Sequence, residues 1–427
     1  MSDSAQFNLN YYLTQPVGNS GDLPVVKLRV SRSDGPPKTL SLFLPTSGGT
    51  RYIVRILEYP LQMSVLDRVK ETPLDCRAIR LADLRHLIWW RKSDYKARLE
   101  VPGLFSITPL LATDGREGRK LKKGLSILRK FGFAVSSMNF QCTPGLFDEW
   151  PPSGVTTSLP ISRRKDDARR PSFAVVLHLY YRDLWPEFAW CLSRLTMSFK
   201  LIMTVNEHDA AFDREVHRVF PDAEIHVMEN RGRDVGPFIE LLRQGHLDRF
   251  DVICKLHGKR SAVSGPRALL GHIWRRANLI DLVGSDEKVE YILQRFQADH
   301  DIGMIGSSRF HFPSKYFHEE GMWGENRNVV IDLIGQLGAN PEGCRAEYYA
   351  GTMFWIGRKP LAVLKQLGLG LSDFEAENGA IDGTLAHAME RLFGMIPSVT
   401  AQKLEDAPVI YDPPDLFPPN PEGSSAP

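Results

Sequence analysis

The chain has 427 residues, of which 43% are hydrophobic and 24% are charged, as in a globular protein of two or three domains. Its 53 Lys and Arg residues nearly balance 51 Asp and Glu residues, which argues against a dedicated nucleic-acid-binding protein. The five cysteines are scattered and never spaced as C-x-x-C, so neither a disulfide framework nor a cysteine zinc site is expected, and a reducing cytoplasm is the simplest setting. The N-terminus is polar, and no apolar window reaches the ~20 residues of a membrane helix, so any membrane contact is expected to be peripheral.

Residues 1–170 are expected to form a small β-rich accessory domain with helical parts. Residues 24–31 (PVVKLRVS) and 39–45 (TLSLFLP) are predicted strands, and the intervening SDGPPK favours a hairpin. Residues 51–58 are a third predicted strand, and 81–90 are predicted to be helical. Residues 116–130 are rich in Lys and Arg, which is typical of a solvated helix face or, alternatively, of a patch that contacts anionic lipid headgroups.

Residues 171–405 show alternating strand and helix patterns. Strands are predicted at 173–180 (FAVVLHLY), 200–205, 223–228 and 250–256, and helices at 185–195, 213–220 and 237–244. Further on come a helix at 286–298, strands at 302–305 and 351–356, and a helix at 382–393. This alternation predicts an α/β fold, a three-layer sandwich with a mostly parallel sheet. Residues 406–427 are Pro-rich and are predicted to be an extended or disordered tail.

Polar and basic residues follow the predicted strands, where ligands of parallel sheets bind. The predicted donor site consists of His178, Tyr180, Tyr181, Asn230, Arg231, Gly232, Arg233, Lys255, His257 and Lys259. Arginine pairs well with phosphate oxygens, and a helix N-terminus offers free N–H groups, so this set suits a diphosphate. Two alternatives stay open: Arg231 or Arg233 could pair with Asp234, and His178 could be a core histidine.

Five motifs give a resemblance to a known family. HLYY (178–181), NRGRDVGPF (230–238), CKLHGKRS (254–261), AGTMFW (350–355) and DGTLAHAMER (382–391) resemble the rhamnan synthesis protein F family. The resemblance implies a role in assembling rhamnose-containing bacterial surface polysaccharides. The arrangement also resembles a type-A glycosyltransferase fold.

An Asp-x-Asp metal motif is expected in that fold at the end of the fourth strand, where this chain has KLH. Asp299 and Asp301 form such a pair, but they precede a strand and so lie at the wrong edge of the sheet. No metal ligand is therefore assigned and no cofactor is expected, although a divalent Mg or Mn ion stays open. Transfer is expected to be metal-independent and to proceed with inversion.

The type-A resemblance implies a catalytic carboxylate at the start of a late helix, which is Asp382 in this chain. Its alternative role is that of a helix N-cap, and Asp234 is the second candidate for the base. Acceptor contacts are predicted for Tyr316, Trp323, Trp355 and Glu390, with residues 310–328 as a lid. Trp355 has the alternative of a core residue.

The predicted function is transfer of a deoxyhexose, with rhamnose suggested by the resemblance, from a nucleotide diphosphate sugar to a lipid-linked glycan. The polysaccharide would be an O-antigen, capsule or cell-wall glycan, and the enzyme would work in the cytoplasm at the inner face of the bacterial plasma membrane. The alternative is a non-catalytic glycan- or nucleotide-binding scaffold of a polysaccharide assembly complex. The absent Asp-x-Asp motif favours the scaffold, whereas Asp382 and the basic strand ends favour the enzyme.

Overall fold

The computed structural model describes residues 170–408, with gaps at 261–265, 314–321 and 381, and the individual strands of the N-terminal part of the chain. The chain divides into two compact units. One contains residues 1–155, 261–270 and 411–427, and the other contains residues 156–260 and 271–410. The candidate site lies in the second unit, which is therefore described more fully.

The first unit contains two antiparallel sheets. Their strands are β1 (Leu9–Leu13), β2 (Val25–Arg32), β3 (Lys38–Phe43), β4 (Arg51–Ile56), β5 (Leu61–Leu66), β6 (Glu71–Pro73), β7 (Arg77–Ala78), β8 (Leu99–Val101) and β9 (Phe105–Leu110). The sheet orders are β7-β1-β4-β9-β8 and β3-β2-β5-β6. β2 and β3 pair antiparallel where the sequence indicates a hairpin. The predicted helix at 81–90 and the basic stretch at 116–130 lie outside the described residues, so the accessory domain stays a prediction.

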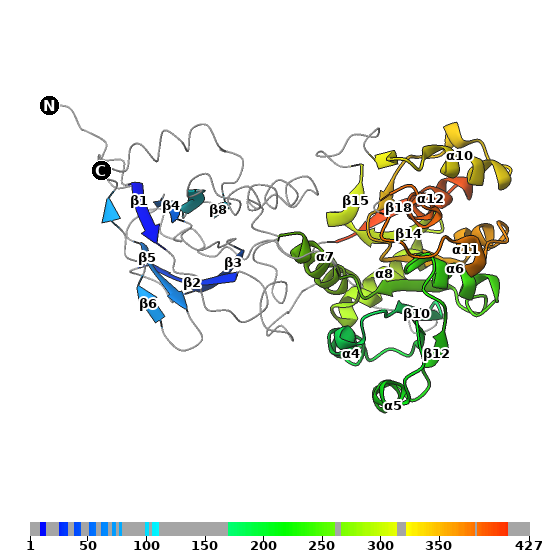
Figure 1. Cartoon of the computed structure of the whole chain (residues 1–427), viewed down its shortest axis with the longest axis horizontal. Helices are drawn as coiled ribbons and strands as arrows, with labels where there is room; N and C mark the ends of the chain where they lie inside the picture. Colours follow the sequence, from blue (N-terminus) through cyan, green and yellow to red (C-terminus); the bar gives the residue numbers. More distant parts are fainter. Residues whose placement is uncertain are drawn as a thin grey trace. The chain divides into compact units, whose positions relative to one another are not determined.

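The second unit is built on a seven-stranded sheet (Figure 1). Its strands are β10 (Phe173–His178), β11 (Lys200–Val205), β12 (Glu224–Val227), β13 (Val252–His257), β14 (Ile302–Ser307), β17 (Phe354–Gly357) and β18 (Lys403–Ala407). The order is β12-β11-β10-β13-β17-β14-β18, and only β17 is antiparallel to its neighbours. A mostly parallel α/β sheet was predicted and is confirmed. A short second sheet pairs β15 (His311–Phe312) with β16 (Tyr348–Tyr349).

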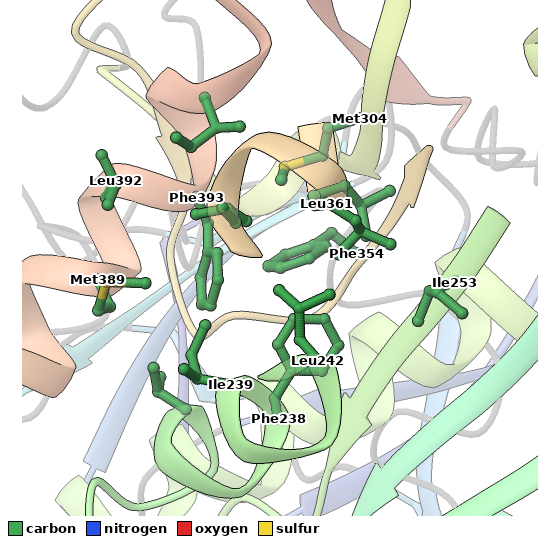
Figure 2. Close-up of a cluster of buried hydrophobic side chains, with 14 of the residues drawn as sticks. Phe238, Ile239, Leu242, Ile253, Met304, Phe354, Leu361, Met389, Leu392 and Phe393 are labelled. Carbon is green, nitrogen blue, oxygen red and sulfur yellow. The ribbon is translucent and has the colours of Figure 1, made fainter. Parts of the chain in front are cut away.

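Helices cover both faces of the large sheet. They are α4 (Trp185–Leu192), α5 (Ala210–Val219), α6 (Val235–Arg243), α7 (Pro266–Val283), α8 (Asp286–Ala298), α10 (Arg327–Gln336), α11 (Arg358–Lys365) and α12 (Leu385–Val399). On one face α6, α10, α11 and α12 bury an aliphatic and aromatic core against the sheet. Figure 2 shows Phe238 of α6, Phe393 of α12 and Leu361 of α11 converging on Phe354 of β17.

The other face of the sheet carries a run of aromatic contacts. Phe173 stacks on Phe199 at 5.6 Å and contacts Trp355 at 5.3 Å, measured between ring centroids. The indole N–H of Trp355 donates to the carbonyl of Leu282 in α7, which fixes that helix to this face. Burial on both faces explains why β10 reads as a continuous apolar run from Phe173 to Leu177.

Two differences from the predicted elements have local causes. The last predicted central strand, at 351–356, begins only at Phe354, because Gly351 and Thr352 have φ values of +88° and +52° and form a turn. β18, which was not predicted, pairs with β14 and runs to Ala407, past the predicted start of the tail at residue 406. Helices α7, α10 and α11 were not predicted. In the part of the chain that the structure describes, no helix combines the length and apolarity that crossing a bilayer requires.

Candidate functional site

The candidate site lies at the carboxyl edge of the parallel strands. β10 ends at His178 and β13 at His257, and these two residues are neighbours in the sheet register. Because β17 runs in the opposite direction, the turn that precedes it, which contains Gly351 and Thr352, reaches the same edge. The candidate site therefore combines the ends of the parallel strands, where ligand-binding residues were predicted, with the turn that precedes the antiparallel strand β17.

A buried ion pair lies at the centre of this edge. Lys255 is 1% exposed, and its Nζ lies 2.5 Å from Oδ2 of Asp234. The same ammonium donates to the carbonyl of Thr352 at 3.0 Å and contacts its hydroxyl at 3.1 Å, while that hydroxyl also donates to Asp234. All three donors of the ammonium are thus used within the protein. The predicted phosphate contact of Lys255 stays a prediction, and it requires this network to rearrange.

The charges of this pair support each other. Burial alone would raise the pKa of Asp234, but His257 and Lys255, together with hydrogen bonds from Lys255 and Thr352, hold it far below its usual range. Asp234 is therefore a carboxylate at any physiological pH, held between a lysine and a hydroxyl. Lys255 and Thr352 occupy Oδ2 of Asp234, and its side chain is 14% exposed against 29% for Asp382, so Asp234 is less accessible to an acceptor, which counts against it as the base.

The two histidines of the edge are neutral at pH 7. Burial lowers the pKa of His178 to about 4 and that of His257 to about 3. His178 Nδ1 lies 2.9 Å from the hydroxyl of Thr204, and His257 Nε2 donates to the carbonyl of Gly351 at 2.7 Å. Each ring is held by a protein partner, so both stabilise the strand ends. Their predicted contacts with a donor remain to be tested.

The turn after β12 adopts a left-handed conformation. Gly232 and Arg233 have φ values of +63° and +56°, and an added Cβ at Gly232 would lie 2.5 Å from ring atoms of Phe374. Only glycine fits at this position without displacing that ring. Asn230, at the start of the turn, is half-buried.

Both arginines of this turn have acidic partners. Arg231 lies 3.0 Å from Glu229 and donates to the carbonyl of Phe374 at 2.9 Å. Arg233 lies 3.0 Å from Glu377, donates to the carbonyl of Ala380, and contacts His387 Nε2 at 3.1 Å. Asp234 pairs with Lys255 and not with these arginines, so the alternative of an arginine pair with Asp234 is wrong. The arginines instead bind the turn to the segment that precedes α12.

Asp382 is held by three groups from outside its own loop. Asn326 Nδ2 donates to Oδ1 at 2.6 Å, the backbone N–H of Glu325 donates to Oδ2 at 3.2 Å, and Arg391 lies 3.8 Å away. Burial would raise the pKa of Asp382, but the hydrogen bond from Asn326 and these other groups lower it, so the group is ionised. The N-cap of α12 is Thr384, so the N-cap alternative for Asp382 is wrong. Its side chain is 29% exposed and can meet a bound substrate.

Glu390 connects the two halves of the site. Its Oε1 accepts the backbone N–H of Gly351 at 2.6 Å, and its Oε2 accepts from Arg391 at 3.0 Å. Arg391 lies between Glu390 and Asp382, so a chain of contacts runs from the turn before β17 to the candidate base. Thr352, Asn326 and Arg391 were not among the predicted site residues. Thr352 and Arg391 lie inside the AGTMFW and DGTLAHAMER motifs, which was the available signal.

The aromatic candidates differ in exposure. Tyr180 is 40% exposed and packs edge-on against Tyr181 at 4.9 Å. Trp323 is half-buried and packs against the core of the unit. Trp355 is fully buried, as its core alternative describes, and presents no exposed ring to a sugar. Tyr316 lies outside the described residues, together with the rest of residues 314–321 of the predicted lid.

Among the described residues, Lys259 forms no ion pair. Its Nζ lies 4.9 Å from the ring centroid of Trp274, a cation–π contact that leaves the charge available to a further anion. Arg260 beside it pairs with Asp183. Of the four predicted phosphate-binding cations, Lys259 is thus the one best placed to meet a ligand.

The fold and the edge define an α/β protein with a polar, partly buried site at the strand ends. Comparison with family models matches residues 155–401, more than half of the chain, to rhamnan synthesis protein F, and the chain belongs to that family. The family connects the chain with the synthesis of rhamnan, a polysaccharide. The chain is also similar to an uncharacterized protein named WxcX from two strains of Xanthomonas campestris pv. campestris, B100 and ATCC 33913. Each is 30% identical over 226 residues, which are 53% of this chain and 31% of the relative, so the match spans about a third of those proteins.

Proposed function

We propose that this chain is a glycosyltransferase that moves a deoxyhexose, most simply rhamnose, from a nucleotide diphosphate sugar to a growing lipid-linked surface polysaccharide. The family supports the polysaccharide, and the mostly parallel three-layer fold is consistent with a type-A-like transferase. We place the reaction in the cytoplasm, at the inner face of the bacterial plasma membrane, with peripheral contact to the lipid-linked acceptor.

The observation that carries the proposal is the environment of Asp382. It is an ionised, partly exposed carboxylate that Asn326 and Arg391 hold in place, and Arg391 links it to Glu390 of the candidate site. In the proposed step, an acceptor hydroxyl attacks the anomeric carbon of the donor and the bond from that carbon to the diphosphate oxygen breaks. Asp382 accepts the proton of the attacking hydroxyl. The nucleotide diphosphate leaves with the negative charge of the broken bond.

We assign stabilisation of that leaving charge to Lys259, with Arg231 and Arg233 at the adjacent turn. We assign stacking on the base or the sugar to Tyr180, whose ring is exposed. No carboxylate pair is assigned to a divalent ion in this step. Turnover is accordingly expected to persist in excess EDTA, and complete loss of turnover that manganese restores would contradict this part of the proposal.

The decisive experiment measures release of free nucleotide diphosphate from a panel of dTDP-, GDP- and UDP-sugars, with and without a lipid-linked glycan. Asp382→Asn should keep the fold and donor binding, measured by thermal shift, and lose at least about 100-fold in turnover, as expected for loss of a general base. Asp332→Asn, on the exposed side of α10, is the matched control and should retain full turnover. Near-normal turnover in Asp382→Asn would remove it as the base.

A non-catalytic scaffold that binds glycan or nucleotide is the second candidate. The observation in its favour is that Lys255, Arg231 and Arg233 all have protein partners, which leaves less positive charge for a diphosphate. The scaffold predicts saturable binding of a nucleotide sugar with no release of nucleotide diphosphate under any acceptor condition. Release that depends on Asp382 would exclude it.

A further inference from the structure

A second polar cluster lies on the edge strand β12, which is separated from β10 of the candidate site by β11. Glu224 and His226 lie on the edge strand β12 with one residue between them, so their side chains project from the same side of the strand. His246 follows the end of α6, and its ring centroid lies 4.4 Å from that of His226. One possible ligand atom from each of the three residues lies within 4.8 Å of the other two.

The cluster has unused hydrogen-bonding capacity. Nε2 of His226 is buried and has no hydrogen-bond partner among the described residues, and the closest acidic atom, Oε2 of Glu224, lies 3.8 Å away. The other oxygen of Glu224 holds the neighbouring cations, with Arg249 at 2.7 Å and Lys200 at 3.1 Å. His246 contacts Gln244 through Nε2 at 3.1 Å, which leaves its Nδ1 for another partner. Each of the three residues therefore offers one possible ligand atom close to those of the other two.

We propose that Glu224, His226 and His246 bind one Zn²⁺ ion, with water in the fourth position. Two imidazoles and a carboxylate, with an open position, are a common zinc ligand set, and imidazole is a good ligand for this ion. Ligand atoms of a tetrahedral zinc site lie about 3.4 Å apart, from bonds of about 2.0–2.2 Å. The cluster must contract by roughly 1 Å, which side-chain rotation of these half-buried residues allows.

Two neighbouring cations act on this site. Lys200 and Arg249 oppose a divalent cation, and they remain bound to the distal oxygen of Glu224. Arg249→Gln, which removes one of these charges, is therefore expected to tighten zinc binding several-fold.

The site would join two ends of one structural unit. β12 begins at Glu224, continues into the left-handed turn at residues 230–234, and is followed by α6, whose end precedes His246. A metal bound to both ends would restrain the turn that carries Arg231 and Arg233. The zinc proposal does not rest on the proposed glycosyl transfer, because none of the three ligands is assigned to the donor or the acceptor.

The test uses the full chain without a histidine tag. Equilibrium dialysis against Zn²⁺ should show one ion bound per chain, and the binding should be lost in His226→Ala and in His246→Ala. His208→Ala, which removes an exposed histidine outside the cluster, is the matched control and should bind like the original chain. Binding that persists in both cluster variants, or no saturable binding to the unaltered chain, would overturn the proposal.

A spectroscopic measurement on the unaltered chain makes the test independent of how the variants fold. X-ray absorption of the zinc-loaded chain should show two imidazoles among the ligands, with oxygen completing the shell. Substitution by Co²⁺ should give the visible absorption of a four-coordinate site. A zinc shell with sulfur, or without imidazole, would refute the assignment to His226 and His246.

Discussion

Replacing Lys255 by Met tests how the buried network supports the candidate site. Met has a similar length and no charge, so the substitution keeps the volume and leaves the carboxylate of Asp234 without its ammonium partner. Removal of one partner from a buried ion pair destabilises a protein by about 3–5 kcal/mol. Because Asp234 is 14% exposed and keeps the Thr352 hydroxyl as a donor, we expect the lower end, about 3 kcal/mol.

Urea unfolding measures the free energy of unfolding of the variant and of the original chain. Hydrogen exchange of peptides from β13 shows whether the loss of stability lies in this unit. The control is a double-mutant cycle with Asp234→Asn, which removes the negative charge instead. Each single variant leaves one buried group unpaired, whereas the double variant leaves none. We therefore expect the double variant to be more stable than the sum of the single losses predicts, by about 2 kcal/mol.

The dependence on pH gives a further check. The pKa of Asp234 is lowered in the folded protein, so its contribution to stability is present above its unfolded pKa and is lost as pH falls. In Lys255→Met the carboxylate of Asp234 lacks its main stabilising charge, so protonation of Asp234 removes an unpaired buried charge and stabilises the folded variant. The stability difference between the two proteins should shrink as pH is lowered from about 7 to about 4. A loss below about 1 kcal/mol at neutral pH, or additive single losses, would refute the account of the network.

Three further predictions concern stability. Burial would lower the pKa of His311, but Asp406 and Glu347 raise it to about 9. This interaction should therefore contribute about 3 kcal/mol to the free energy of unfolding below pH ~6.5, and the contribution should disappear as the pH rises through 9. Urea unfolding of His311→Gln should not show this dependence on pH. Gly232→Ala should cost at least about 2 kcal/mol more than Gly379→Ala, because both have positive φ but only Gly232 has a ring within 2.5 Å of the added carbon. Equal losses would contradict that steric argument. Phe393→Ala should cost about 3–5 kcal/mol by opening a cavity in the core of Figure 2, and a loss near that of a surface substitution would show that the core collapses around it.

The central sheet could be predicted because its strands have a recognisable apolar pattern in the sequence. A strand buried on both faces, such as β10, must be apolar throughout, and the alternation with helices predicts parallel pairing. The reversal of β17 was not predictable, because the direction of a short apolar strand depends on a turn that Gly351 and Thr352 form. Helix α10 was missed because its RNVVIDLIGQ sequence contains several β-branched residues, and its helical state depends on packing against α12.

The location of the candidate site could be predicted from the sequence, but the ion-pair partners of its charged side chains could not. The ends of successive strands identified the edge, since parallel strands bring their carboxyl ends together. The partners of the predicted cations could not be read from the sequence. Glu377, which binds Arg233, is 144 residues away, and Asn326, which binds Asp382, is 56 residues away. No signal in the sequence indicated the proposed zinc ligands either, because one Glu-x-His and a distant histidine are common in any chain.

The backbone conformation of Thr352 indicates the role of the buried network that Lys255, Asp234 and Thr352 form. It is a β-branched residue at φ +52°, a conformation that costs about 1–2 kcal/mol for residues other than glycine. Its carbonyl and hydroxyl bind Lys255, and the hydroxyl also binds Asp234, so the buried pair stabilises the strained turn. The backbone N–H of the adjacent Gly351 donates a hydrogen bond to Glu390, which connects Glu390 to the strained turn. Strain of this kind persists where the surrounding structure overdetermines it, and it concentrates at functional sites. The buried charges are thus better understood as fixing the geometry of the candidate site than as adding net stability to the fold.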